Sequence, residues 1–317
     1  MKEGSLVSIA LCTYNGAGFL AEQLDTLVGQ TYQNIEIVVV DDCSTDSTLL
    51  ILNEYAERYP QFKIYQNKSN LGFIGNFERA VTLCTGGLIA LCDQDDLWHL
   101  QKIELQVEAL KEHVLVYHDS EFIHEDGIAI NKKMSDLMNL YRGDNPEAFL
   151  FFNCVSGHTI LMKRDLLDYA LPLKKGFFHD WWLAYVATNI GSIDFIPQSL
   201  VQYRQHDKSE TNILQLDREK DNYKRTSIER YEETLKWLAQ CRSFKANKNQ
   251  AFVDEVYEAY KKREDSYFAF QFGILLLKHW HAIFYMRKKS TISKLNYIRK
   301  QFLGIKAKKL VNGTWMQ

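Results

Sequence analysis

The sequence predicts an α/β fold with a mostly parallel central sheet and helices on both faces. Three apolar segments are typical of buried strands, at residues 6–11, 35–40 and 88–92, and residues 62–65 form a further short strand. The segments between them carry Leu, Phe and Val at helical spacing, as amphipathic helices do. Strands that alternate with helices at this pitch form βαβ units, in which the strands are parallel.

The first two strands both end in polar residues. The first ends at Thr13-Tyr14-Asn15 and the second at Asp41-Asp42, and helices are expected from about Ala17 and over residues 49–56. Because the carboxyl ends of parallel strands share one edge of a sheet, these residues should meet in one crevice. No glycine-rich phosphate loop follows a strand, so a nucleotide would be held by carboxylates, an aromatic ring and a metal instead.

A turn with three carboxylates, Asp93-Gln94-Asp95-Asp96, follows the fourth strand. Carboxylates packed so closely repel one another, and Mg²⁺ or Mn²⁺ would offset that repulsion. The alternative is a solvated acidic loop that caps the next helix, which is expected to run from Trp98 to Glu112.

The pattern changes beyond a strand at residues 114–117. Asp126-Gly127 predicts a hairpin turn, and 159–162 predicts a further strand. His179-Asp180-Trp181-Trp182 begins a helical segment, and a strand from Ile193 leads to Tyr203-Arg204-Gln205-His206. From about Leu214 the chain is expected to be helical to its end.

The composition predicts one large domain, or one domain with an appendage. The chain has 317 residues, 46% of them hydrophobic, and no low-complexity segment. Its six cysteines form no CxxC pair, which favours free thiols in a reducing compartment. The first residues lead into only about eight apolar positions, too few for a secretory signal, so we expect a cytoplasmic protein.

Taken together, the motifs between residues 6 and 206 resemble glycosyltransferase family 2, the inverting enzymes with the GT-A fold. Ser8–Asn15 is similar to the family's opening strand, which implies that Tyr14 stacks on the donor's pyrimidine, with Thr13 and Asn15 beside it. Val40–Asp46 is similar to its second signature, which implies that Asp42 accepts a hydrogen bond from the base N3–H.

The carboxylate turn resembles the family's DxD element. The resemblance implies that Asp95 binds the Mg²⁺ or Mn²⁺ ion and that Asp93 lies near the sugar or ribose. His206 would complete the metal shell or contact the diphosphate, against the alternative of a solvated loop histidine. Arg204 is a candidate for the diphosphate, against the alternative of a surface salt bridge.

His179-Asp180-Trp181-Trp182 falls where the family carries its catalytic base. The implied reaction is a single displacement at an anomeric carbon, with Asp180 removing the acceptor's proton and His179 helping to orient it. The alternative is that Asp180 only caps its helix. Trp181 or Trp182 would offer an apolar platform to a deoxysugar, unless both are helix core.

The combination of DQDDxW, HDWW and YRQH looks most like rhamnosyltransferases of bacterial surface polysaccharide. The donor implied is dTDP-L-rhamnose, with a UDP-hexose as the alternative. The QxxRW motif of processive synthases is absent, so we expect single sugars to be transferred. The catalytic domain should span residues 1–210, with a nucleotide-binding half to about 118 and an acceptor half after it, followed by a helical extension at 211–317.

The tail has a strongly asymmetric charge. After Asp265 the chain has no acidic residue and ten basic ones, interleaved with aliphatic and aromatic residues. That combination suits an amphipathic helix that lies on the anionic inner face of the cell membrane, where a lipid-linked glycan acceptor would be found. The alternative is a helix packed on the catalytic domain or on a homodimer partner. Nucleic acid is not an expected partner, because the rest of the chain is acidic.

Two other kinds of function fit parts of this pattern. A sugar-nucleotidyltransferase also uses an α/β sheet with acidic metal ligands, but it needs a basic glycine-rich loop after the first strand, where this chain has Thr13-Tyr14-Asn15-Gly16. A non-catalytic sugar-nucleotide binding module would not need all of Asp93, Asp95 and Asp180. A donor-hydrolysis assay with and without Mn²⁺ separates these alternatives from a transferase.

Overall fold

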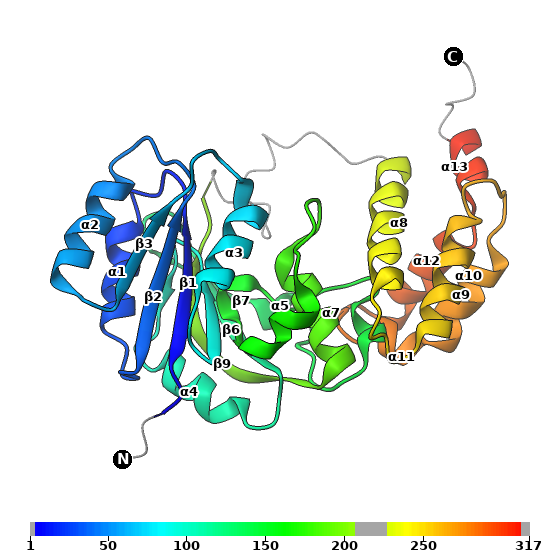
Figure 1. Cartoon of the computed structure of the whole chain (residues 1–317). Helices are drawn as coiled ribbons and strands as arrows, with labels where there is room; N and C mark the ends of the chain where they lie inside the picture. Colours follow the sequence, from blue (N-terminus) through cyan, green and yellow to red (C-terminus); the bar gives the residue numbers. More distant parts are fainter. Residues whose placement is uncertain (1–3, 207–226, 312–317) are drawn as a thin grey trace. The chain divides into compact units, whose positions relative to one another are not determined.

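The protein is described by a computed structural model that covers residues 4–206 and 227–311 and divides into two compact units (Figure 1). The first unit contains residues up to Asp144 and those from Cys154 to the end of the first described range. The second contains Asn145–Asn153 and the described residues from 227 onward. The segment Asn145–Asn153, which the sequence places inside the catalytic domain, therefore belongs to the second unit.

The strands of the first unit form one mixed sheet in the order β3-β2-β1-β4-β8-β6-β9-β5, with β7 paired to β6. The strands are β1 (Val7–Thr13), β2 (Ile35–Asp41), β3 (Phe62–Gln66), β4 (Leu88–Cys92), β5 (Leu97–Trp98), β6 (Leu115–Ile123), β7 (Ala129–Lys133), β8 (Leu161–Lys163) and β9 (Ile193–Arg204). The helices are α1 (Leu20–Val28), α2 (Thr48–Arg58), α3 (Gly72–Leu83), α4 (Lys102–Leu110), α5 (Met134–Leu137), α6 (Leu167–Ala170) and α7 (His179–Ile190).

The half of the sheet made by β3, β2, β1 and β4 is parallel throughout. Leu11 lies opposite Val39 in one neighbour and Cys92 in the other, so the carboxyl ends of the three strands coincide. β1, β2 and β4 are buried on both faces, as strands must be when helices cover both sides, whereas β3 at the edge of the sheet is partly exposed. Side chains of α1, α2 and α4 share one core cluster with one face of these strands.

The second half of the sheet adds antiparallel pairs. β8 runs antiparallel to β4 and β6, whereas β6 and β9 are parallel. The predicted hairpin is confirmed: β6 and β7 pair antiparallel, and Gly127 in the turn adopts a φ of 83°, which glycine tolerates without strain. The α/β fold expected from the sequence, with a mostly parallel sheet and flanking helices, is therefore confirmed.

The helix expected from Trp98 begins four residues later, at Lys102. Leu97 and Trp98 instead form the short edge strand β5, in which Trp98 pairs with Val201 of β9. Trp98 is buried, and the Nζ of Lys102 lies 3.0 Å from the centre of its ring. Apolar spacing favoured a helix here, but pairing with a strand 100 residues away determines the backbone.

The second unit is helical, as the sequence predicts for the described part of this region. Its helices are α8 (Ser227–Ser243), α9 (Gln250–Lys261), α10 (Phe270–Lys278), α11 (Trp280–Ile283), α12 (Thr291–Gln301) and α13 (Ile305–Val311). The segment Asn145–Asn153 packs into it: Phe151 contacts Tyr260 and Phe272, and Glu147 forms an ion pair of 2.8 Å with His279. The expected helix at 214–226 lies outside the described residues.

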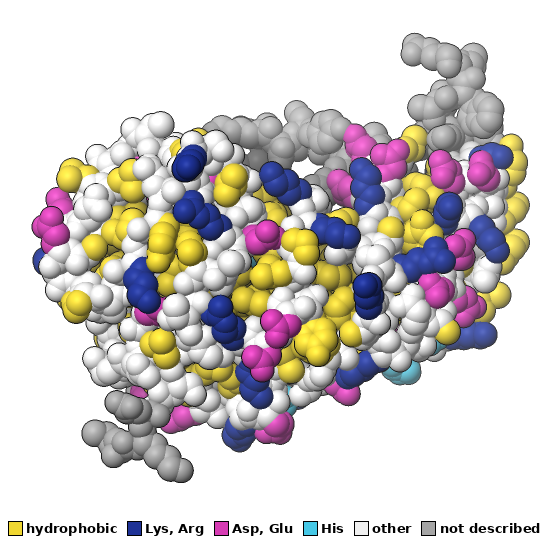
Figure 2. All heavy atoms as spheres, viewed as in Figure 1, with side chains coloured by type: hydrophobic (Ala, Val, Ile, Leu, Met, Phe, Trp, Pro, Cys, Tyr) yellow, Lys and Arg dark blue, Asp and Glu magenta, His cyan; other side chains and the backbone are white. Residues whose placement is uncertain are grey.

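The surface of this second unit carries hydrophobic side chains beside both basic and acidic side chains, on the face shown in Figure 2. Among residues 4–206 and 227–311, none of the helices is both long enough and apolar enough to cross a bilayer.

Candidate active site

The loop after β1 is joined to the carboxylate turn by one side-chain amide. The backbone N–H of Tyr14 donates to Oε1 of Gln94 over 2.8 Å, and Nε2 of Gln94 donates to the carbonyl of Tyr14 over 3.0 Å. The paired bonds hold the two loops in fixed register and leave the Tyr14 side chain about half exposed, at 50%. An exposed ring on a fixed backbone is suited to stack on a planar ligand.

The loops after β1 and β2 are also joined to each other. Oγ1 of Thr13 donates to Asp41 over 3.0 Å, and Oδ1 of Asn15 accepts from the backbone N–H of Thr45 over 2.8 Å. Asn15 adopts a φ of 48°, a left-handed conformation that asparagine tolerates better than most residues. Thr13 and Asn15, both expected at the donor, thus use their side chains to hold the backbone around Tyr14.

Asp42 is buried and lies between its own strand and the start of α3. Its carboxylate accepts from Nδ2 of Asn67 at 2.5 Å and from the backbone N–H groups of Leu71 and Gly72 at 2.8 and 2.9 Å. Because a carboxylate has about four lone-pair sites, these three bonds leave one position for a further donor. The expected bond to a base therefore stays a prediction.

Asp95 and His206 come together from turns 111 residues apart in the chain. Nε2 of His206 lies 2.8 Å from Oδ2 of Asp95, and both side chains are largely buried, at 6% and 16% exposed. The ring of His206 packs 4.9 Å from that of Phe19. One carboxylate oxygen and one imidazole nitrogen at this separation are suitable ligands for a divalent cation.

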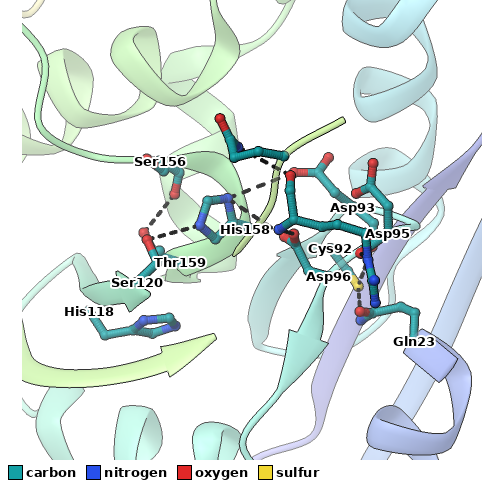
Figure 3. A network of polar contacts seen from close by, with 12 residues as sticks. Gln23, Cys92, Asp93, Asp95, Asp96, His118, Ser120, Ser156, His158 and Thr159 are labelled. Atoms are coloured by element: carbon teal, nitrogen blue, oxygen red, sulfur yellow. Dashed lines mark hydrogen bonds and ion pairs between the residues drawn. The ribbon is translucent and has the colours of Figure 1, made fainter. Parts of the chain in front are cut away.

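A second group of candidate ligands lies on the other side of the same turn (Figure 3). Nδ1 of His158 is 3.8 Å from Asp96 and 4.0 Å from Asp93, and its Nε2 is 3.2 Å from Oγ of Ser120. One ligand atom from each of these two carboxylates and the imidazole lies within 4.8 Å of the others. Oδ2 of Asp96 is buried and has no hydrogen-bond partner. These residues therefore fit a cation that would satisfy the orphaned oxygen.

Burial determines the charge state of this group. It raises the pKa of Asp93 to about 7, with a further increase from the charge of Asp95, and it raises the pKa of Asp96 above its usual value. It lowers the pKa of His158 to about 3, so the imidazole is neutral at physiological pH and has a free lone pair for a ligand.

Arg204 holds the carboxylate turn in place. Its backbone N–H donates to Asp96 over 3.1 Å and its Nε to the carbonyl of Asp95 over 2.8 Å. Its guanidinium forms an ion pair of 2.7 Å with Glu22 and lies over the ring of Phe19. The side chain of Arg204 is buried and bound to its own chain, which favours a role in positioning the turn, and the expected contact with the diphosphate stays a prediction.

Asp180 lies at the N-terminus of α7. Its Oδ1 accepts from the backbone N–H of Trp181 over 2.5 Å, and burial raises its pKa to about 7, partly offset by hydrogen bonds from backbone groups that include Gly157. The negative charge of Asp180 also raises the pKa of Asp93, which places the two carboxylates near one another. A carboxylate with a pKa close to physiological pH is suited to act as a general base.

The residues on either side of Asp180 in the motif differ from expectation. His179 stacks on Phe77 at 4.3 Å, neither of its ring nitrogens has a hydrogen-bond partner, and burial lowers its pKa to about 4. It therefore packs in the core and does not orient Asp180 through a hydrogen bond. Trp182 is also core: its Nε1 donates to Ala170 over 2.8 Å and its ring stacks on Tyr185. Trp181, partly exposed, keeps the predicted role of sugar platform.

The comparison with known proteins identifies the family of this sheet and its polar edge. The model of glycosyl transferase family 2 matches residues 8–170, just over half of the chain. The chain belongs to glycosyl transferase family 2.

This family 2 glycosyltransferase resembles several known proteins. It is 29% identical over 227 residues to an uncharacterized glycosyltransferase of Haemophilus influenzae, which covers 67% of the chain and 69% of that relative. The structure of Staphylococcus aureus TarS 1–349 in complex with UDP-GlcNAc matches with a TM-score of 0.58 and 17% identity, over 88% of this chain and 81% of that one. The Pyrobaculum calidifontis mannosyltransferase PcManGT, in complex with GDP-Man and Mn²⁺, matches with a TM-score of 0.54 and 17% identity, over 94% and 79% of the two chains.

These matches confirm the GT-A-like fold and the glycosyltransferase class that the sequence predicts. Two contacts in the glycosyltransferase site were not predicted. They are the hydrogen bonds between Gln94 and the backbone of Tyr14 and the ion pair between Glu22 and Arg204. For the Gln94 contact, the sequence signal is the position of an amide side chain between two acidic residues. No local feature of the sequence indicates the contact of Glu22 with Arg204.

Proposed function

We propose that this glycosyltransferase transfers a single sugar with inversion, from a nucleoside diphosphate sugar to an acceptor hydroxyl. The observation that carries the proposal is that polar residues from four separate segments lie around one edge of the sheet. The ring of Tyr14 is joined to the carboxylate turn through Gln94, Asp95 contacts His206, and the charge of Asp180 acts on Asp93.

Each residue has a role in this proposal. Tyr14 stacks on the base, and Asp42 offers its remaining lone pair to the base N3–H. Asp93 lies near the ribose or the donor sugar. Asp180 takes the proton from the acceptor hydroxyl, on the face of the sugar opposite the diphosphate, and because no covalent glycosyl-enzyme forms, one such base suffices for inversion.

Asp95 and His206 would hold the divalent cation, Mg²⁺ or Mn²⁺, with Asp93, Asp96 and His158 as the alternative set. When bound, the cation neutralises the negative charge that develops on the leaving diphosphate. The chain's own contribution is to orient these ligands: the backbone N–H of Arg204 donates to the carboxylate of Asp96, and its Nε donates to the backbone carbonyl of Asp95.

For the donor we propose dTDP-L-rhamnose, with a UDP-hexose as the alternative, because the DQDD and HDWW motifs resemble rhamnosyltransferases. Thermal shift with dTDP-rhamnose, UDP-glucose, UDP-GlcNAc and GDP-mannose, each with Mn²⁺, tests this directly. Stabilisation by dTDP-rhamnose above the others is the expected result, and stabilisation by a UDP-sugar alone would replace it with the alternative.

We also propose that the acceptor is a glycan or a lipid-linked glycan at the inner face of the cell membrane. This rests on the basic, acid-free segment after Asp265, which would be attracted to anionic lipids. The alternative partner of this segment is a second copy of the chain in a homodimer.

Replacing Tyr14 by Ala should weaken nucleotide binding by about 3- to 10-fold, the range of an aromatic stacking contact. Tyr14→Phe should bind nearly as well as the native protein, because stacking needs the ring and not the hydroxyl. Titration calorimetry with dTDP and UDP measures both. Tyr169→Ala is the matched control, because Tyr169 is equally exposed in the same unit. Equal affinity of Tyr14→Ala and Tyr169→Ala would remove the stacking role.

The rate of transfer should depend on pH through Asp180. Because its pKa is raised to about 7, the base is protonated and inactive in acid and becomes active as the pH rises. The logarithm of kcat/KM should therefore rise with a slope of about one up to pH 7 and then level off. Initial rates between pH 5 and 9 at saturating Mn²⁺ measure this, and a flat profile over that range would assign the proton transfer to another group.

A further inference from the structure

The helix α10 in the second unit has an apolar face that is about half exposed in the described residues. Phe270, Ile274 and Leu277 recur at the spacing i, i+4, i+7 and are 61%, 46% and 44% exposed. The opposite face of the same helix, with Phe272, Leu275 and Leu276, is buried in the unit. Apart from Gln271 and Lys278, the helix is therefore apolar on both its buried and its exposed face, which is unusual for a helix at a water-exposed surface.

The exposed face continues onto the neighbouring backbone. Phe268, 60% exposed, forms an antiparallel bridge with Leu303, and the backbone N–H of Ala269 donates to Phe302 over 2.7 Å. The rings of Phe268 and Phe270 stack at 5.6 Å. Phe268, Phe270, Ile274, Leu277 and Leu303 thus form one apolar ridge, and its backbone is fixed by hydrogen bonds rather than free to fold inward.

The stretch of chain that carries the ridge is basic, although two exposed acidic residues, Glu264 and Asp265, come just before it. From residue 266 onward the sequence has no acidic residue, and the exposed basic side chains include Lys278, which ends α10, and the pair Lys288 and Lys289. Arg299 and Lys300 are exposed at the end of α12. Asp265, the acidic residue directly before this stretch, has its Oδ1 3.9 Å from Nζ of Lys306. The partner of this surface must accept both apolar side chains and many positive charges.

We propose that the ridge inserts into the interfacial layer of an anionic lipid bilayer, with the basic residues of 278–308 on the lipid headgroups. Aromatic and aliphatic side chains beside Lys and Arg are the features of a surface that lies on a membrane rather than crossing it. Each basic residue near an anionic surface adds to the attraction, and the attraction weakens as salt rises. This inference rests on the membrane location in the proposed function and names the surface that makes the contact. It also identifies α10, rather than the basic helix α12, as the part that inserts.

Flotation of the full-length protein with vesicles tests the proposal. The vesicles contain phosphatidylcholine with or without phosphatidylglycerol and carry no glycan, so neither donor nor acceptor is involved. The protein should float with the anionic vesicles, and binding should fall when the salt is raised. Neutral vesicles should bind at least about tenfold less.

The variant Phe268→Ser/Phe270→Ser should reduce binding to the anionic vesicles by about tenfold or more, because two large apolar groups no longer enter the bilayer. Leu50→Ser is the matched control: Leu50 is a similarly exposed apolar residue, at 62%, in the first unit, and its loss should leave binding unchanged. Ile292→Ser on α12, where Ile292 is 73% exposed, should have a smaller effect than the ridge variant. Equal losses at Ile292 and the ridge, or none at the ridge, would overturn the proposal.

Sedimentation velocity of the same variants tests the alternative that the ridge binds a second copy of the chain. The proposal fails if three results occur together: the native protein is a dimer, the ridge variant is a monomer, and neither protein floats with vesicles. In that case the ridge is a dimer interface. Metal-dependent turnover of the donor in the ridge variant separates this outcome from the chemistry: the membrane proposal can fail while turnover persists, and a failure of the transferase proposal would leave flotation unaffected.

Discussion

Replacing Asp180 by Asn should reduce transfer by about 10²- to 10⁴-fold, the contribution typical of a positioned general base. Asn has nearly the same shape and can still accept the hydrogen bond from Trp181, but it cannot take a proton from the acceptor. Donor binding and its dependence on Mn²⁺ should be unchanged, because Asp180 lies on the acceptor side in the proposal. Single-turnover rates, with donor affinity from calorimetry, measure both.

Asp168→Asn is the control for this variant, because Asp168 is an exposed carboxylate in the same unit. A second readout comes from stability. The folded-state pKa of Asp180 is raised, so the proton it holds stabilises the folded state at low pH, and this stabilisation is lost as the pH rises through about 7. The neutral Asp180→Asn protein should therefore melt higher than the native protein at pH 8, with the difference shrinking towards pH 4. Unchanged turnover of the variant would move the base elsewhere.

Replacing Asp95 by Ala should abolish the increase in nucleotide affinity that Mn²⁺ produces and reduce turnover by about 10²-fold or more, as expected when the cation that stabilises the leaving diphosphate is lost. Asp95 is not needed for the fold of the turn, because Arg204 binds its backbone carbonyl and not its carboxylate. Titration of dTDP or UDP with and without Mn²⁺ gives the first result. An undiminished effect of Mn²⁺ would exclude Asp95 as a ligand.

Two histidine variants distinguish the two candidate ligand sets. His206→Ala should weaken the effect of Mn²⁺ if the cation binds beside Asp95, whereas His158→Gln should leave it unchanged. The reverse result would place the cation between Asp93, Asp96 and His158. Both can be read from Mn²⁺ affinity alone, measured by paramagnetic resonance in the absence of donor.

The parts of the fold that could be predicted from the sequence are those determined by local pattern. The buried strands are β-branched, apolar segments of four to six residues, and the polar residues that end them, such as Tyr14 and Asp95, necessarily lie at one edge of a parallel sheet. The hairpin at Asp126-Gly127 carries its own signal, because Asp-Gly favours a tight turn. The placement of Asp95 beside His206 needed the family resemblance in addition, since nothing local relates two residues 111 positions apart.

The parts that could not be predicted depend on contacts between distant segments. Trp98 is a strand residue because β9 pairs with it, and Arg204 is buried because Glu22 of α1 and the carbonyl of Asp95 accept its donors. The same applies to Trp182, whose place in the core follows from the hydrogen bond to Ala170. The residue types permit either alternative, helix or strand for Trp98 and site or core for Arg204 and Trp182, and the choice depends on the three-dimensional neighbours.

The segment Asn145–Asn153 has a practical consequence for dissecting the protein. A chain cut near residue 210, at the boundary that the sequence suggests, would keep Phe151 and Phe152 but lose the rings they pack against, Tyr260, Phe272 and Phe284. Two large aromatic side chains would then be exposed to solvent in the shortened protein. Poor solubility of such a fragment would therefore reflect these unburied rings and would say nothing about whether the catalytic half needs the helices for its chemistry.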